Sequence, residues 1–70
     1  MDIKSPAVGK VLRLLVEPGA HVERGDEIMV IESMKMEIPI KAPASGSIKE
    51  LRVKVGDQIQ RNNVLAVIEG

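Results

Sequence analysis

The chain has 70 residues, no cysteine, no aromatic residue of the Phe, Tyr or Trp type, and a formal net charge of zero from ten basic and ten acidic residues. A nucleic-acid-binding surface needs an excess of positive charge, and a single-strand platform also needs aromatic rings, so we expect no nucleic-acid partner. No apolar run approaches the roughly 20 residues of a membrane-spanning helix and no signal peptide opens the chain, so we expect no membrane association and a cytoplasmic location.

The length allows one domain, residues 1–70, with a limited core. No disulfide can stabilise it, and His21 has no ligand-spaced neighbours, so we expect no metal site. Val and Ile together make up 17 of the 70 residues. A β-branched chain without aromatic residues favours compact all-β structure.

An internal repeat organises the sequence. A shift of 37 residues aligns residues 1–33 with residues 38–70, and 12 of the 33 pairs are identical, among them Ile3/Ile40, Pro6/Pro43, Gly9/Gly46, Gly19/Gly56 and Val30/Val67. Such a period indicates repeated supersecondary units that share a core. Two copies favour a closed β structure with pseudo-two-fold symmetry, because closure removes exposed strand edges.

Each repeat predicts a succession of short strands. In chain order we expect strands at 1–4, 10–16, around Val22 and at 28–32, and their copies at 38–41, 47–55, around Ile59 and at 64–69. Turns are expected at Pro18-Gly19, Gly25-Asp26, Val55-Gly56-Asp57 and Asn62-Asn63. No window has a sustained 3.6-residue period, so no helix is expected.

Several single residues carry further expectations. Pro39 inside its strand predicts an edge position or a bulge. The repeat-related pairs Gly9/Gly46 and Gly19/Gly56 are interpreted as turn residues that need a positive φ. His21, the repeat mate of Gln58, is interpreted as a solvated loop residue.

Only the segment 34–37, Met-Lys-Met-Glu, has no copy in the other half. The two-fold argument places it at one end of the molecule, with the chain termini at the other. Tight turns prefer Asn, Gly, Asp or Pro, whereas Met is favoured at adaptable binding surfaces. An exposed lysine usually has no special role, but a Met-flanked lysine at the centre of a repeat predicts that Lys35 is recognised by another molecule.

The run Glu32-Ser33-Met34-Lys35-Met36-Glu37 resembles the biotinylation motif of biotin carboxyl carrier domains, part of the biotinyl/lipoyl attachment family. The resemblance covers the whole chain, including residues 5–9 and 42–46. It implies a flattened barrel-sandwich of two four-stranded antiparallel sheets with the modified lysine at a hairpin tip. Ser33 stands where many members have Ala. The repeats align without a gap, so we expect a thumbless, stand-alone attachment protein or a carrier module of another biotin enzyme.

The resemblance also implies a function. Lys35 would be biotinylated by a biotin protein ligase, and the carboxybiotin arm would carry CO2 between a biotin carboxylase and a carboxyltransferase. The chemistry would belong to biotin and to those partners, so the chain itself is expected to be non-catalytic. Met34 and Met36, with Ser33 and Glu37 beside them, are assigned to recognition by the ligase and partners. Glu32 is interpreted as solvating the hairpin, because its repeat mate has no lysine beside it.

Two alternatives stay open. Lipoyl domains have the same fold and hairpin lysine but usually place Asp before it and Ala after it; here both neighbours are Met, which favours biotin over lipoate. A dual biotin/lipoyl attachment protein is a variant of this first alternative. The second alternative is an unmodified interaction module. No Ser-His-Asp set, phosphate loop or paired-carboxylate motif is present to suggest catalysis.

Overall fold

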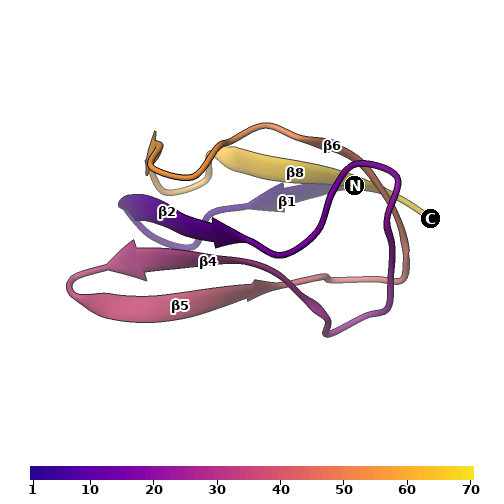
Figure 1. Ribbon diagram of the computed structural model, residues 1–70, viewed down its shortest axis with the longest axis horizontal. Coiled ribbons are helices and arrows are strands. Elements are labelled where there is room, and N and C mark those ends of the chain that lie inside the picture. Colours follow the sequence, from indigo (N-terminus) through magenta and orange to yellow (C-terminus); the bar gives the residue numbers. More distant parts are fainter.

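The computed structural model describes all residues 1–70 and consists of eight β-strands without a helix (Figure 1). The strands are β1 (Asp2–Lys4), β2 (Gly9–Leu14), β3 (His21–Val22), β4 (Glu27–Ser33), β5 (Met36–Lys41), β6 (Gly46–Leu51), β7 (Gln58–Ile59) and β8 (Val64–Glu69). They form two four-stranded antiparallel sheets, in the orders β1-β8-β6-β3 and β5-β4-β2-β7. The predicted all-β flattened barrel-sandwich is therefore confirmed. A helix long and apolar enough to cross a membrane is not found.

The two sheets repeat each other's strand register. Asp2 of β1 lies opposite Val67 of β8, and Pro39 of β5 lies opposite Val30 of β4, with both partners displaced by 37 positions. Applying that displacement to one strand order, β1-β8-β6-β3, gives the other, β5-β4-β2-β7. The sequence repeat thus corresponds in the structure to a pseudo-two-fold axis that exchanges the two sheets. Pro39 lies in an edge strand, as predicted, where a missing N–H costs no ladder bond.

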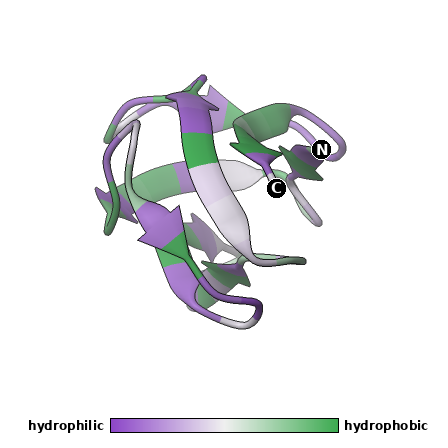
Figure 2. Cartoon of the chain, turned by 90° about the vertical axis from the view of Figure 1, so that its right-hand side faces the viewer, coloured by the Kyte–Doolittle hydropathy of each residue, from purple (hydrophilic) through white to green (hydrophobic).

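The core lies between the sheets and is built from aliphatic side chains of both repeats. Thirteen buried residues form it, and three repeat-related pairs among them are at most 1% exposed: Val11 and Ile48, Ile28 and Leu65, and Met29 and Ala66. Figure 2, viewed from the end where the termini lie, shows the strands arranged around this interior. Small branched side chains from both sheets fill the narrow space without any aromatic ring.

The predicted strands 10–16 and 47–55 are wrong at their ends, because the structure ends them at Leu14 and Leu51. After these residues the chain crosses from one sheet to the other. The crossing is fixed by the Gly19 amide, which donates to the Ile48 carbonyl at 2.7 Å, and by the equivalent Gly56 amide. Hydrophobic residues beyond the strand ends still pack on the core, so their alternation gives no sign that ladder pairing has stopped.

The glycines divide into two kinds. Gly19 and Gly56 have φ of 93° and 94°, as predicted for turns. The prediction is wrong for Gly9, which lies in a strand and has no positive φ. There a side chain is excluded because a Cβ would overlap the carbonyl oxygen of Glu32 in β4. Its repeat mate Gly46 is nearly extended, at φ 159°, and is crowded in the same way by β8.

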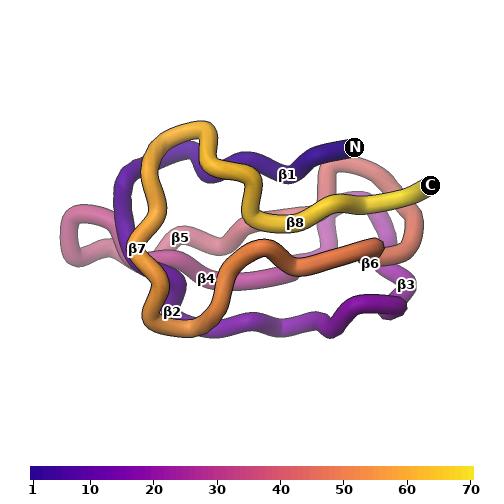
Figure 3. The backbone as a smooth tube through the Cα atoms, turned by 90° about the horizontal axis from the view of Figure 1, so that it is seen from above, coloured from indigo at the N-terminus to yellow at the C-terminus, as the bar shows by residue number.

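The molecule is elongated, with principal extents of 31 × 18 × 17 Å. The connection between β4 and β5 lies at one end of the long axis, and both chain termini lie at the other (Figures 1 and 3). This arrangement agrees with the two-fold argument, because the connection and the termini occupy equivalent places around the axis.

Candidate modification site

The β4–β5 hairpin closes in a turn of two residues, Met34 and Lys35, with φ of 52° and 66°. Positive φ at both central residues is the pattern of a type I′ turn, whose twist matches that of paired strands. The turn is shorter than the predicted tip 34–37, since Met36 and Glu37 already belong to β5. Lys35 therefore occupies the second central position of the turn, at the end of the hairpin.

This turn forces two ordinary residues into a left-handed backbone. Non-glycine residues in that conformation carry a penalty of about 1–2 kcal/mol each. Strand pairing supports them, because the antiparallel register continues without interruption to the turn, with Ile31 opposite Ile38 and Ser33 opposite Met36. The hairpin therefore holds Lys35 at a fixed place on rigid elements, in a conformation that Asn or Gly would adopt more readily.

The side chains of the turn project into solvent. Met34 is 92% exposed and Met36 is 68% exposed, so neither contributes to the core. Lys35 is also exposed and forms no ion pair and no side-chain hydrogen bond. An unpaired amine between two uncovered thioether chains gives nothing to the fold and is open to another molecule. An exposed primary amine without a partner fits covalent attachment of an acyl group.

The base of the hairpin carries charged residues. Among the predicted site residues, Glu37 has an ion-pair partner. Its Oε1 accepts a hydrogen bond from Nη2 of Arg13 in β2, at 2.8 Å. Glu32 lies directly opposite Glu37 in the register. Ser33 is half-buried beside the turn. The structure thus brings the predicted residues Ser33, Met34, Met36 and Glu37 together around Lys35.

Two residues near the site were not found by sequence reasoning. Arg13 lies far from the motif along the chain, and its repeat mate is Glu50, so the duplication gave no signal for it. The sequence predicts Gly9 to be a turn residue, whereas its lack of a side chain lets β2 approach β4 next to the hairpin. Both come from β2, the strand that supports the hairpin from one side.

A second polar cluster lies in another part of the fold. Ser45 Oγ donates to Glu23 Oε2 at 2.8 Å, and His21 Nε2 lies 3.2 Å from Glu23 Oε1. The hydrogen bond from Ser45, then that from His21, lowers the pKa of Glu23 below its ordinary value. The serine hydroxyl is bound to the carboxylate and not to the imidazole, so the cluster is no nucleophilic triad. His21 is exposed but belongs to β3, not to a loop as predicted.

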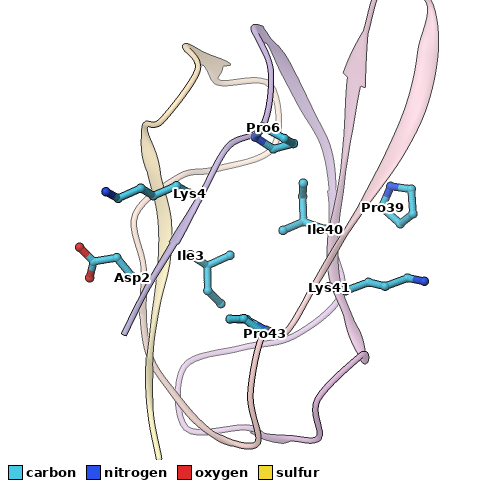
Figure 4. Close-up of a pocket in the computed structure, with 8 residues that line it drawn as sticks. All are labelled: Asp2, Ile3, Lys4, Pro6, Pro39, Ile40, Lys41 and Pro43. Atoms are coloured by element: carbon cyan, nitrogen blue, oxygen red, sulfur yellow. The ribbon is translucent and has the colours of Figure 1, made fainter.

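No group of three His, Cys, Asp or Glu side chains is arranged to hold a metal ion. The structure does contain a groove of about 320 Å³ between the edge strands β1 and β5 (Figure 4). Its lining consists of four repeat-related pairs: Asp2/Pro39, Ile3/Ile40, Lys4/Lys41 and Pro6/Pro43. The groove therefore follows from the meeting of two symmetry-related edges, and no residue of the turn lines it.

Comparisons with known proteins agree with this geometry. A family model described as "Biotin-requiring enzyme", for biotin/lipoyl domains, matches residues 1–68. The biotinylated protein TB7.3 of Mycobacterium bovis is 42% identical over 39 residues, which are 56% of this chain and 55% of that protein. The alignment thus spans about half the length of the curated relatives.

Solved structures match over nearly the whole chain. The urea carboxylase of Kluyveromyces lactis superposes with a TM-score of 0.94 and 32% identity, covering 99% of this chain and 6% of that one. The lipoyl domain of the 2-oxoglutarate dehydrogenase complex of Azotobacter vinelandii superposes with a TM-score of 0.85 and 30% identity, covering 100% of this chain and 96% of that domain. One fold is thus shared with a part of a carboxylase and with a lipoyl domain.

Proposed function

The chain belongs to the family of biotin- and lipoyl-attachment domains, and from that premise we propose that it is a biotin carboxyl carrier modified on Lys35. The observation that carries the proposal is the position of Lys35, unpaired and exposed in the two-residue turn at one end of the molecule. The chain serves as a non-catalytic carrier in a biotin-dependent carboxylase or decarboxylase, within the cytoplasm.

The flanking residues favour biotin as the group. Both neighbours of Lys35 are methionines, and both are largely exposed. Their flexible thioether chains offer an adaptable apolar surface to a biotin protein ligase. The similarity to a protein described as biotinylated supports this choice, and the similarity to a lipoyl domain keeps lipoate as the second candidate.

Attachment is a nucleophilic acyl transfer. The deprotonated Lys35 amine attacks the acyl carbon of a ligase-bound biotinyl adenylate, an amide bond forms, AMP leaves with the electron pair of the broken acyl–phosphate bond, and the nitrogen loses one of its two protons and keeps the other as the amide N–H. Once bound, biotin supplies a ureido nitrogen that accepts and releases carboxylate. The hairpin keeps the attachment point clear of the body, and the lysine with the biotin chain forms a tether on the order of 12–15 Å long.

Tethering explains why a carrier of this kind needs no pocket of its own. An arm anchored at one end of a rigid domain reaches a carboxylase site and a carboxyltransferase site at a high effective concentration. The matching region in urea carboxylase is a small part of a much larger chain, which supports such a role beside partner active sites.

The proposal is tested by incubation with a biotin protein ligase, ATP and biotin, followed by a streptavidin blot and intact mass. Wild type is expected to gain one biotin and Lys35→Arg none. Lys54→Arg is the matched control, because Lys54 is also exposed in a connection between two strands but belongs to the second repeat and not to the turn. Labelling of Lys35→Arg equal to wild type would remove this residue from the proposal.

The choice between the two groups needs a parallel reaction with a lipoate ligase and lipoate. Intact mass separates the two adducts. We expect the biotin adduct on wild type and little lipoate, whereas Met34→Asp is expected to weaken biotinylation without loss of the fold. Efficient lipoylation with no biotinylation would assign the chain to the lipoyl carriers instead.

A further inference from the structure

The outer face of the β5-β4-β2-β7 sheet carries four charged side chains near the turn. One row across the sheet consists of Lys10, Glu32 and Glu37, each opposite the next in the register of β2, β4 and β5. The fourth is Arg13, further along β2. These residues lie on the strands that hold Lys35 in place, so their interactions act on the hairpin directly.

Glu32 and Glu37 form an unfavourable pair. Side chains directly opposite each other in an antiparallel ladder have Cβ atoms about 4.5–5.5 Å apart, and like charges there are destabilising. Glu32 has no ion-pair partner within 4.0 Å, whereas Glu37 is bound to Arg13 at 2.8 Å. The guanidinium therefore offsets the repulsion between two strands that must stay paired to support the turn.

The Arg13–Glu37 contact spans the central strand β4. Arg13 lies opposite Val30, and Val30 lies opposite Pro39 on β5, two positions from Glu37. Val30 is only 6% exposed although it is not part of the core cluster. Its repeat mate Val67, which has Glu50 as neighbour in place of an arginine, is less completely buried. Arg13 and Val30 are directly opposite in the register, and the charged end of Arg13 reaches Glu37 beyond β4, a path on which the apolar stem of an arginine can cover the valine.

We propose that Arg13 is a positioning residue for the modification hairpin. By holding Glu37 across β4 it relieves the repulsion between Glu32 and Glu37 and fixes the direction in which the turn presents Lys35 to the modifying ligase. The part that concerns the ligase rests on the proposed function. The part that concerns the hairpin is a property of the unmodified chain and is tested separately.

A matched control is present in the same chain. Arg52 and Glu50 also form an ion pair of 2.8 Å, with side-chain exposures of 52% and 47% against 55% and 59% for Arg13 and Glu37. The control pair joins residues two positions apart on one stretch of chain, so it ties no two strands together. Arg52→Gln and Arg13→Gln therefore remove the same interaction chemistry with different structural consequences.

The first measurement is amide hydrogen exchange by NMR on the unmodified domain. In Arg13→Gln, the β5 amides next to the turn are expected to exchange about two- to fivefold faster than in wild type, the range set by an exposed ion pair. Arg52→Gln should leave these amides unchanged. The charge swap Arg13→Glu with Glu37→Arg should restore slow exchange. Exchange that is equally fast in both single variants, or unchanged in both, overturns the positioning role.

The second measurement is steady-state biotinylation. Arg13→Gln is expected to raise the KM for the domain about threefold at low salt without changing kcat, because the Lys35 amine itself is untouched. The difference from wild type should shrink at about 0.5 M NaCl, where surface charges are screened within a few ångströms. A KM equal to that of Arg52→Gln contradicts the inference. Wild type that accepts no biotin contradicts the proposed function, and the exchange measurement still decides the role of Arg13.

Discussion

Gly9 of β2 approaches the backbone of Glu32 in β4 so closely that a Cβ on Gly9 would overlap the Glu32 carbonyl oxygen. Glu32 is two residues before the turn, so this contact sets how β4 enters the hairpin that presents Lys35. A close backbone approach of this kind is one of the few uses of glycine that involve no special φ.

Gly9→Ala is therefore expected to do two things. Overpacking against a backbone atom should lower the free energy of unfolding by about 1–3 kcal/mol, measured by chemical denaturation. It should also slow biotinylation, because β4 must shift next to the turn. The repeat mate provides the control: Gly46→Ala meets Glu69 in the same way at the opposite end. It should lower stability but leave the modification rate of the folded protein unchanged, and equal slowing in both variants would argue against the local effect.

Met34 lowers the stability of the turn, and its proposed role is in recognition by the ligase. Met34 has φ 52° and a side chain that is 92% exposed, so it pays a backbone penalty and gains no packing. Met34→Asn places a residue that tolerates this conformation at the first position of a type I′ turn. The free energy of unfolding should rise by about 0.5–1 kcal/mol, and the melting temperature by about 2–8 °C, while biotinylation becomes slower.

The second flanking methionine separates these two effects. Met36 is also exposed, at 68%, but lies in β5 without a positive φ. Met36→Asn should therefore bring no gain in melting temperature, since Asn is disfavoured in strands. If thermal denaturation shows the same gain for both variants, backbone strain at Met34 is not its source.

The duplication explains why so much of the fold was predictable. Every strand has a copy, so the weak alternation of one segment is supported by the other, as for the two-residue strands around Val22 and Ile59. The strand ends were not predictable, because Val53 packs on the core after ladder pairing has stopped. The backbone of the turn was also hidden, since neither Met34 nor Lys35 is a residue that turns prefer.

The candidate site was likewise predictable only in part. Its motif residues are contiguous, so the sequence alone brings Ser33, Met34, Lys35 and Met36 together. The residues that support the hairpin come from β2: Arg13 through its side chain and Gly9 through its lack of one. Their placement depends on the register between β2 and β4. Because the bulge between Val11 and Arg13 shifts that register by one residue, simple alternation does not place Arg13 on the outer face with Glu37.

The cluster around Glu23 predicts a pH dependence of stability. Its carboxylate accepts from Ser45 and contacts His21, and the first of these hydrogen bonds is the larger cause of its lowered pKa. A carboxyl group whose pKa is lower in the folded than in the unfolded chain binds fewer protons when folded. It therefore stabilises the fold above the unfolded pKa, and this contribution is lost as the pH falls through the folded pKa.

Ser45→Ala removes the larger cause. NMR titration should show the pKa of Glu23 moving back up toward its ordinary value of 4.5. The stability advantage of wild type over the variant should be present at pH 7 and smaller at pH 3, in denaturation curves recorded at both values. An unchanged pKa in Ser45→Ala would mean that the hydroxyl does not hold the carboxylate in solution.

The last pair of equivalent turns tests how much of the fold depends on backbone conformation alone. Gly25 and its repeat mate Asn62 have φ of 92° and 71°, and a Cβ at Gly25 would meet no atom within 4 Å. Gly25→Ala should therefore lower the free energy of unfolding by about 1–2 kcal/mol through the left-handed backbone and not through a clash. Gly25→Asn should cost less, since Asn already occupies the equivalent turn. Chemical denaturation of both variants decides this, and an equal cost for Ala and Asn would show that the loss has another source than φ.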